Sequence, residues 1–451
     1  MAARDRALGI SDKAGAPGVP HAESIGRPPA PAGGGRLRRW LKSLGPGLVT
    51  GAADDDPSGI GTYSVAGAAF GFATLWTAII TLPLMTVVQF ICNKIAMVSG
   101  TGLAGVLREH YPRWVLYPAV AGLVIANTIN VGADISAIGA AINLLVPVPI
   151  GFLIVPVALL IVALQIWSHY KTIVQIFKWL TLTLFAYIAA AFLARPHWAE
   201  ALKATFVPHV RLDHDYLTTV LAILGTTISP YLFFWQASQE VEQEVSEGRT
   251  RRADRIGTTD EELERAKIDT VSGMLFCNLI FYFVIVACAA TLHASGNTEI
   301  KSAADAAEAL RPFAGSFATW LFAIGLIGAG FLAVPVLSGS SAYAIAETFG
   351  WKYGLDTKPW EARQFYAVIA LSTFVGIGID FIGINPIRAL FWTAVINGMI
   401  SPPLLVLIML ASNNKKVMGR RVNGWFTNTV GWIATAVMFA AAIGMLLTPS
   451  G

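Results

Sequence analysis

Three consecutive carboxylates, Asp54–Asp56, stand directly before a proline and close to a glycine, within the sequence Asp-Asp-Asp-Pro-Ser-Gly. Pro57 has no backbone N–H to give and disfavours helix at the residue before it, while Gly59 adds backbone freedom. The segment interrupts an apolar stretch, where ionised carboxylates need a cation, a water-filled cavity or a proton. A helix broken here would expose carbonyls beside the Asp56 carboxylate. Such a group of oxygens can bind a metal ion.

A simple proline kink is the alternative interpretation of this segment. One aspartate would then cap the second half-helix, and the others would face water. Three acids at one break argue against this alternative and favour the metal site.

A second interruption follows in the segment 225–231, Gly-Thr-Thr-Ile-Ser-Pro-Tyr, again with a proline among small polar residues and without a charge. Proline kinks are frequent in membrane helices, so this segment alone is weak evidence. Interrupted spans at corresponding positions of two halves, however, indicate the binding site of a transporter.

The elements that position these breaks follow from the composition. The 451 residues are 55% hydrophobic and 13% charged, about half the charged fraction of a soluble domain. Many windows reach the roughly 20 apolar residues that a membrane span needs. Only helices and closed barrels satisfy the backbone in lipid, and these blocks are too long for barrel strands. We therefore expect an all-α polytopic membrane protein. Nucleic-acid binding has no support, since no folded basic domain is present.

The apolar stretches predict about eleven transmembrane helices. Their expected positions are 44–70, 74–98, 115–145, 150–167, 171–194, 216–244, 267–293, 316–347, 364–383, 387–412 and 425–448.

Charge placement predicts the orientation. Residues 1–35 are rich in Pro, Gly and Ala and predict a disordered cytoplasmic tail. Basic residues concentrate in the loops after the sixth and tenth expected spans, around Arg249–Lys267 and Lys415–Arg421. The positive-inside rule then places the N-terminus in the cytoplasm and the C-terminus outside. We expect a multi-pass protein of a cell membrane, most simply a bacterial inner membrane.

Further polar residues within the spans are functional candidates, because such groups are costly in lipid. Asp134 and Asn130 belong to one polar stripe of the third span, and Asn397 and Ser401 lie in the tenth. The three cysteines stand in apolar runs without a metal-ligand spacing and are interpreted as core residues. No HExxH or GxSxG motif is present, which argues against an enzyme.

The stretch from Gly45-Pro46-Gly47 through Asp56-Pro57-Ser58-Gly59 resembles the first helix of the Nramp family of divalent metal transporters, whose core motif reads Asp-Pro-Gly-Asn. The tenth span resembles the family pattern from Asn385-Pro386 through Pro403 to Lys416-Val417-Met418-Gly419. The second span matches at Gln89, Lys94, Ser99-Gly100, Leu103-Ala104, Arg108 and Tyr111-Pro112.

This resemblance covers residues 40 to 425 and implies a leucine-transporter-like fold, with broken helices 1 and 6 in an inverted repeat of five plus five helices. The single transmembrane domain, 36–451, would divide into repeats 36–196 and 214–412 and an additional helix, 425–448. No resident cofactor and no obligate protein partner are implied, because the divalent cation is the transported substrate.

The departures from the family pattern bear on the substrate. The family's asparagine maps onto Gly59, which has no side-chain ligand, and its Met-Pro-His motif maps onto Ser229-Pro230-Tyr231. The family's acidic residue of the third helix falls near Ser136, within about a turn of Asp134. Thr227 of the second break is included with Tyr231 and Asp134 among the residues of the pathway.

Replacing a thioether with a hydroxyl leaves an all-oxygen site, which suits hard ions. The family's metal-binding aspartate maps onto Asp56, so the resemblance makes Asp56 the central ligand. The site would comprise Asp56, Ser229, the position of Gly59 and the carbonyls near Ala53 and Thr226. Asp54 and Asp55 would raise the local cation concentration or line the path. The chain looks like the Nramp-related magnesium transporter branch. This resemblance implies import of Mg²⁺, with Mn²⁺ as a second candidate substrate, by alternating access without proton coupling.

Two other functions remain open at this stage. One is a proton-coupled transition-metal symporter of the Nramp type for Mn²⁺ or Fe²⁺, in which Asp134 carries protons. The other is a symporter of an organic solute, whose anionic group the three aspartates would repel.

Overall fold

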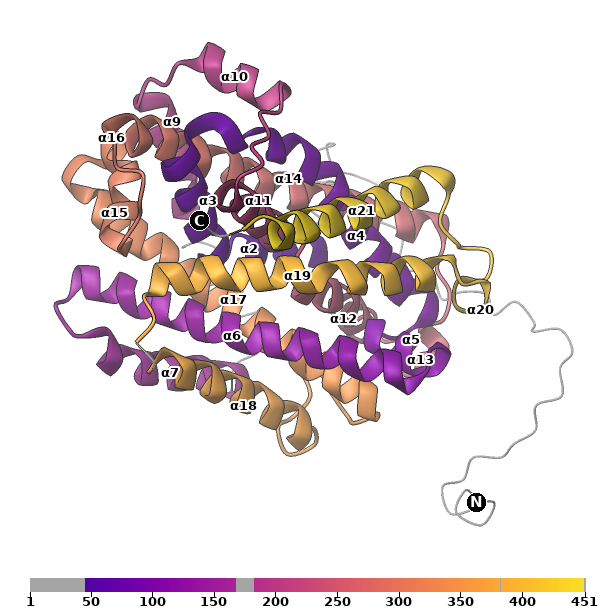
Figure 1. The fold of residues 1–451 in the computed structure, drawn as a ribbon. Coiled ribbons are helices and arrows are strands. Elements are labelled where there is room, and N and C mark those ends of the chain that lie inside the picture. Colours follow the sequence, from indigo (N-terminus) through magenta and orange to yellow (C-terminus); the bar gives the residue numbers. More distant parts are fainter. Residues whose placement is uncertain (1–44, 168–181, 382, 450–451) are drawn as a thin grey trace, which may run out of the picture.

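The computed structural model describes residues 45–167, 182–381 and 383–449, and these residues form a bundle of helices (Figure 1). Eight helices in these ranges are long and apolar enough to cross a membrane. The predicted tail at residues 1–35 and part of the expected fifth span lie outside the described residues. The expectation of a polytopic, all-α membrane protein is confirmed for the part of the chain that is described.

The helices of the first half alternate long spans with short connecting pieces. They are α2 (Pro46–Asp54), α3 (Pro57–Phe70), α4 (Trp76–Ser99), α5 (Leu103–His110), α6 (Arg113–Leu145), α7 (Ile150–Trp167), α9 (Ala186–Leu193) and α10 (Trp198–Phe206).

The second half follows the same alternation. Its helices are α11 (His214–Thr227), α12 (Pro230–Ser246), α13 (Arg252–Arg255), α14 (Asp260–Thr291), α15 (Ala303–Ala307), α16 (Arg311–Ala314), α17 (Ala318–Phe349), α18 (Arg363–Asp380), α19 (Pro386–Asn413), α20 (Lys415–Met418) and α21 (Trp425–Leu447).

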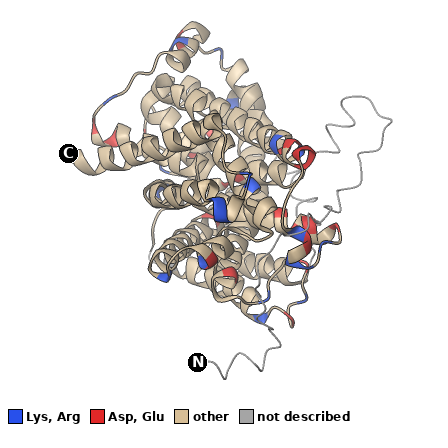
Figure 2. Ribbon diagram, turned by 90° about the vertical axis from the view of Figure 1, so that its right-hand side faces the viewer, with Lys and Arg blue, Asp and Glu red and all other residues tan. Residues whose placement is uncertain are grey.

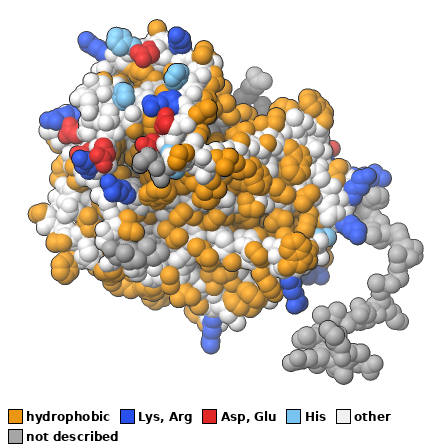
Figure 3. All heavy atoms as spheres, in the orientation of Figure 1, with side chains coloured by type: hydrophobic (Ala, Val, Ile, Leu, Met, Phe, Trp, Pro, Cys, Tyr) orange, Lys and Arg blue, Asp and Glu red, His pale blue; other side chains and the backbone are white. Residues whose placement is uncertain are grey.

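Apolar side chains cover the outer surface of the bundle. In the face shown by Figure 3 they form a broad field across the middle, while most charged side chains lie toward the two ends. Phe152 on α7, Leu371 on α18 and Trp392 on α19 are among the large exposed hydrophobic residues. Charged residues occupy only a small part of the ribbon and gather near loops and helix ends (Figure 2). A soluble protein would not leave so much apolar surface in water, so this surface faces lipid.

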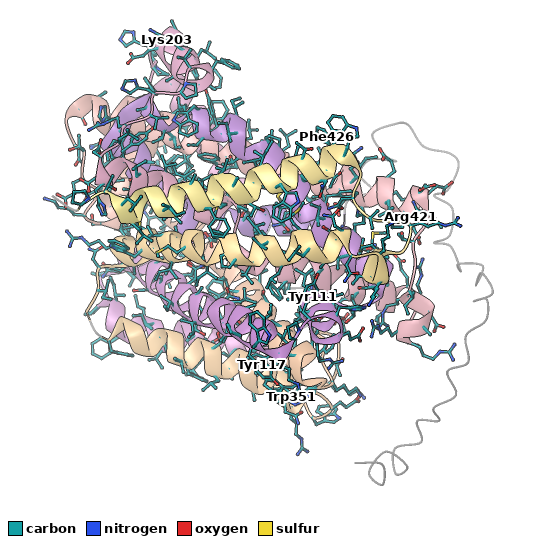
Figure 4. The ribbon with its side chains drawn as sticks, turned by 45° about the vertical axis from the view of Figure 1, so that its right-hand side comes forward. Tyr111, Tyr117, Lys203, Trp351, Arg421 and Phe426 are labelled. Carbon is teal, nitrogen blue, oxygen red and sulfur yellow. The ribbon has the colours of Figure 1, made fainter. Side chains whose placement is uncertain are left out.

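The two basic loops lie at the same end of the bundle. Arg421, which follows α20, pairs with Asp260 at the start of α14 and donates to the Thr258 carbonyl at 3.1 Å. Figure 4 shows Arg421 at this end and Lys203 of α10 at the opposite one. The C-terminal end of α21 also lies opposite, because His214 at the start of α11 contacts the Thr448 carbonyl at 2.9 Å.

Aromatic rings are placed near the end of the bundle that carries α5. Tyr117 stacks on Phe349 with centroids 6.2 Å apart, and Phe349 stacks on Trp351 at 5.2 Å. Tyr117 and Trp351 are close together in Figure 4. Amphipathic rings at this level are typical of the boundary between lipid and water.

Helix α2 is fixed at its first turn by a carboxylate from another helix. Asp269 of α14 accepts hydrogen bonds from the amides of Gly45 (2.7 Å), Gly47 (2.6 Å) and Leu48 (3.2 Å). These amides have no partner within α2, so the Asp269 carboxylate caps this helix from the neighbouring helix α14. Helices α2 and α14 also touch through backbone, since a Cβ added at Gly51 would overlap Gly273.

Close packing also separates the two helix breaks from the end of the bundle opposite α5. A Cβ added at Gly225 of α11 would overlap the Ala394 carbonyl and Gly398 of α19, and one at Gly61 of α3 would lie 3.1 Å from Leu390. Outside this contact, a cavity of about 630 Å³ opens between α3, α11 and α19. Asp54, Asp55, Asp56 and Ser229 at the two helix breaks are each at most 1% exposed. The structure therefore shows a state in which the breaks are closed to solvent.

Candidate functional site

Both predicted breaks are present, and each proline frees one carbonyl. Helix α2 ends at Asp54 and α3 begins at Pro57; α11 ends at Thr227 and α12 begins at Pro230. A helix bond would run from each proline nitrogen to the carbonyl four residues earlier. Because proline has no N–H, the Ala53 and Thr226 carbonyls lose their helical donors. The sequence interpretation named both carbonyls.

The two breaks meet at Gly59. A Cβ built on this residue would lie 3.2 Å from the Asp54 carbonyl oxygen and 3.3 Å from both Asp56 Oδ1 and Thr226 Oγ1. Oxygens from both interrupted helices thus surround one glycine. A larger side chain here would crowd them, so the glycine preserves the space between the breaks.

The two oxygens of Asp56 have different environments. Oδ1 accepts from the Gly59 amide at 2.6 Å and from the Ser58 hydroxyl at 2.8 Å, which makes Asp56 the N-cap of α3. Oδ2 accepts longer bonds of 3.3 Å from the Asn130 amide and the Tyr231 hydroxyl. The capping half of the proline-kink interpretation is therefore confirmed. It engages only Oδ1 and leaves Oδ2 with weaker, exchangeable partners.

Hydroxyl groups cover the carbonyls that the breaks expose. Tyr231 Oη lies 3.2 Å from the Ala53 oxygen, and Ser229 Oγ lies 2.6 Å from the Thr226 oxygen and 2.9 Å from that of Gly225. A third hydroxyl, from Ser401 of α19, donates to the Ile228 oxygen at 2.8 Å. A hydroxyl has one proton and two lone pairs, so these groups can turn to bind a cation instead.

The remaining predicted residues of the second break differ from one another. Asn397, one turn before Ser401 on α19, is buried, and neither polar atom of its side chain has a hydrogen-bond partner. The Thr227 hydroxyl instead bonds back to the Ile223 and Leu224 carbonyls of its own helix at 2.9 and 3.3 Å. The structure thus gives Thr227 a local structural contact.

Asp54 and Asp55 are buried instead of lining an open path. Asp54 Oδ2 lies 2.7 Å from the Cys277 thiol of α14, and both oxygens of Asp55 lack a hydrogen-bond partner. The expectation that the other acids of a kink face water is wrong in this closed state. From the sequence, Cys277 was interpreted only as a core residue. Its contact with Asp54 joins positions 223 residues apart, so the local sequence carried no sign of it.

Asp134 completes a group of buried carboxylates around the first break. It interacts electrostatically with Asp56 and with the Ser58 amide, although neither of its oxygens has a well-formed hydrogen bond. Asn130, one turn earlier on α6, is the residue that reaches Asp56 Oδ2. The polar stripe of the third span therefore faces the break.

No group of three or more His, Cys, Asp or Glu side chains in the described ranges has the spacing of a preformed metal cage. The donors that converge are one carboxylate, several hydroxyls and main-chain carbonyls. Two discontinuous helices that bring such groups together inside a membrane bundle are typical of transporters with the leucine-transporter-like fold.

Comparison with known proteins identifies the family. The family model described as "Natural resistance-associated macrophage protein-like", Nramp, matches residues 47–448. The chain belongs to the Nramp family.

Curated relatives share this full-length match. A divalent metal cation transporter MntH of Brucella suis is 26% identical over 424 residues, covering 92% of this chain and 88% of the relative. One of Caldanaerobacter subterraneus is 25% identical and covers 92% and 95%.

Solved structures confirm the fold. A manganese transporter of Eremococcus coleocola aligns with a TM-score of 0.69 at 18% identity, covering 94% of this chain and 89% of that structure. The inward-facing conformation of Mhp1 aligns with a TM-score of 0.52 at 15% identity, with 90% and 89% covered.

Proposed function

We propose that this protein transports divalent metal cations across the membrane by alternating access, with the cation bound between the breaks of α2/α3 and α11/α12. The observation that carries the proposal is the meeting of Asp56 with carbonyls freed by two prolines around Gly59. Relatives named as divalent metal cation transporters match the whole domain, which supports the same substrate class here.

The ligands follow from which oxygens are free to change partners. Asp56 Oδ2 and the Ala53 carbonyl share one hydroxyl, and the Thr226 carbonyl is held by Ser229. We assign these three oxygens and Ser229 Oγ as direct or water-mediated ligands. Gly59 supplies space instead of a ligand. Asn397 and Ser401 lie one turn apart beside the second break and would bind the cation's waters.

The chemistry of these donors favours a hard cation. Mg²⁺ prefers oxygen ligands, keeps several waters and binds through one or two carboxylates. A thioether, which favours softer metals, is absent from position 229. We therefore propose Mg²⁺ as the substrate, with Mn²⁺ also accepted, moving into the cytoplasm without a coupled proton.

A transition-metal symporter coupled to protons is the second candidate. Two observations favour it: the Cys277 thiol adjoins Asp54, and Asp134 is a buried carboxylate without a well-formed hydrogen bond. A thiol is a soft ligand, and a buried carboxylate can carry a proton.

The proposed organisation keeps the two repeats at 36–196 and 214–412, with 425–448 as an added helix. We propose that the end carrying α5, α13 and α20 is cytoplasmic. Its loops hold Arg251, Arg252, Lys415 and Arg421, and basic loops remain inside. The N-terminus would then be cytoplasmic and the C-terminus external.

Uptake into proteoliposomes tests these proposals together. Purified protein would be reconstituted, and Mg²⁺, Mn²⁺ and Cd²⁺ uptake measured in competition while the internal pH is recorded. We expect saturable Mg²⁺ and Mn²⁺ uptake, no acidification and loss of transport in Asp56→Ala. Asp215→Ala, at the rim of the external cavity, is the matched control. Wild-type uptake by Asp56→Ala would refute the site, and acidification that follows metal entry would favour the symporter.

A further inference from the structure

The Tyr231 hydroxyl stands between two proposed cation ligands from different sides of the first break. It lies 3.2 Å from the Ala53 carbonyl oxygen and 3.3 Å from Asp56 Oδ2. Ala53 belongs to α2, whereas Asp56 caps α3. A single phenol oxygen therefore contacts two proposed ligand oxygens, one from each half of the interrupted helix.

The phenol cannot satisfy both oxygens at once. It carries one proton, so it donates to either the carbonyl or the carboxylate and leaves a lone pair on the other. Both distances are at the long end for hydroxyl donors, whose usual separation is about 2.7–2.8 Å. These contacts are weaker than the 2.6 Å bond that holds the capping oxygen of Asp56.

The tyrosine is held both by its backbone and by the packing of its ring in the core. Its carbonyl accepts a 2.8 Å hydrogen bond from Ser340 of α17, and it occupies the first turn of α12 directly after Pro230. The residue is almost completely buried. The fold therefore presents the hydroxyl to the break in a fixed direction, and rotation of the O–H bond alone changes which oxygen receives its proton.

From this geometry we infer that Tyr231 is a specificity-determining residue whose hydroxyl holds the place of the cation in the unloaded, closed site. A divalent ion bound to the Ala53 oxygen and Asp56 Oδ2 would approach each to about 2.0–2.6 Å. The phenol proton points at a lone pair of one of these oxygens and would repel a cation there, so the O–H bond must turn away before the cation binds. A cation binds only if its gain exceeds that of the displaced hydroxyl, which disfavours weakly bound monovalent ions.

This inference rests on the proposed function, and its test uses equilibrium binding of Mn²⁺ to purified, detergent-solubilised protein by titration calorimetry. Tyr231→Phe keeps the ring and removes only the competing hydroxyl. We expect Mn²⁺ to bind the variant roughly 3- to 10-fold more tightly, the factor that corresponds to one ordinary hydrogen bond. Na⁺ inhibition of Mn²⁺ binding should increase in the same variant.

Tyr63→Phe is the matched control. Tyr63 is a buried tyrosine of α3 that interacts electrostatically with the same aspartates, but its hydroxyl has no hydrogen-bond partner. Its removal should leave Mn²⁺ affinity unchanged. Thermal unfolding adds a second readout. Metal-free Tyr231→Phe should melt below wild type, because the Ala53 and Asp56 oxygens lose the one donor that they share, and Mn²⁺ should raise its melting temperature by more than that of wild type.

Each outcome decides the inference. Weaker Mn²⁺ binding by Tyr231→Phe would show that the phenol is itself a ligand, and unchanged affinity would show that it does not compete; both overturn the placeholder role. Failure of the proposed function looks different. In that case wild type itself would not bind Mn²⁺, or Asp56→Ala would bind it as wild type does.

Discussion

Removal of the Asp269 carboxylate should release α2 and open the end of the bundle that carries α5. This carboxylate accepts hydrogen bonds from three amides in the first turn of α2. Those amides have no partner inside their own helix. In an open state α2 would lie away from α14 and water would solvate the amides. The carboxylate therefore stabilises the closed state relative to the open one.

The expected size of the effect follows from the number of bonds. Loss of an N-cap acceptor costs about 0.5–2 kcal/mol, and three bonds to one charged group place Asp269 at the upper end of this range. About 2 kcal/mol corresponds to a shift of roughly 30-fold in the closed-to-open equilibrium. Asp269→Asn keeps the shape but only one acceptor oxygen, so its shift should be intermediate.

Cys277 is a native reporter of this opening. Its thiol is buried on α14 and donates to Asp54 at the end of α2. Departure of α2 would expose it, while Cys92 and Cys288 lie on other buried surfaces. The assay is the rate of modification by a membrane-impermeant maleimide added to the face that carries α5, in membrane vesicles of defined orientation.

We expect Cys277 of Asp269→Ala to be modified roughly 30-fold faster than Cys277 of wild type, because the labelling rate follows the open fraction when opening and closing are faster than labelling. Cys277→Ser in the same background should abolish the accelerated labelling, which assigns it to this thiol. Thermal unfolding would first establish that Asp269→Ala is folded. Equal labelling rates in wild type and this variant would then refute the idea that the Asp269 cap holds α2 in its closed position.

Three further predictions concern selectivity, packing and charge. Ser229→Met should shift competition in the uptake assay toward Cd²⁺ and Mn²⁺ and away from Mg²⁺, since a thioether is a softer ligand; unchanged selectivity would remove Ser229 from the ligands. Gly225→Ala forces a methyl group into the backbone of α19 and should destabilise the protein by about 1–3 kcal/mol in denaturant unfolding, whereas Gly151→Ala, with open space around it, should be nearly neutral. Arg252 lowers the pKa of Glu109 through their hydrogen-bonded ion pair, so the pair stabilises the fold above the ordinary Glu pKa and loses this contribution as the pH falls through the lowered value. Glu109→Gln should therefore reduce the melting temperature at pH near 7, and this reduction should shrink steadily as the solution is acidified below the ordinary Glu pKa; a reduction that does not change on acidification would contradict the linkage.

The positions of the helices were predictable because lipid imposes a simple rule. Spans of about 20 apolar residues stand out from the loops, and the expected third span, 115–145, corresponds to α6 at Arg113–Leu145. The breaks were predictable for the same chemical reason at both sites. Pro57 and Pro230 cannot continue a helix, and each begins a new one.

The partners of the buried polar groups were not predictable from local sequence. Asp54 meets Cys277 and the first turn of α2 meets Asp269, contacts that join positions more than 200 residues apart. Such pairs depend on how α2 packs on α14, which no local pattern encodes. A carboxylate in the seventh span was nevertheless a signal, because intramembrane acids are functional candidates by default, and Asp269 could have been noted on that ground.

The directions of the side chains at the breaks were also not predictable from the sequence. Thr226 and Thr227 are adjacent threonines in the same break, yet Thr226 Oγ1 faces Gly59 while the Thr227 hydroxyl bonds to its own helix. Asp56 likewise divides its two oxygens between a helix cap and the open break. Sequence spacing identified the correct segment, but only the packed structure distinguishes these neighbours.

Anomalous diffraction from crystals grown with Mn²⁺ tests the central claim most directly. We predict one strong Mn²⁺ peak inside the bundle, within about 2.0–2.6 Å of Asp56 Oδ2 or the Ala53 carbonyl oxygen, and its loss in crystals of Asp56→Ala. A peak that persists in Asp56→Ala, or Mn²⁺ found only in the cavity between α3, α11 and α19 beside Asp213 and Glu299, would contradict the assignment of the cation site to the two helix breaks.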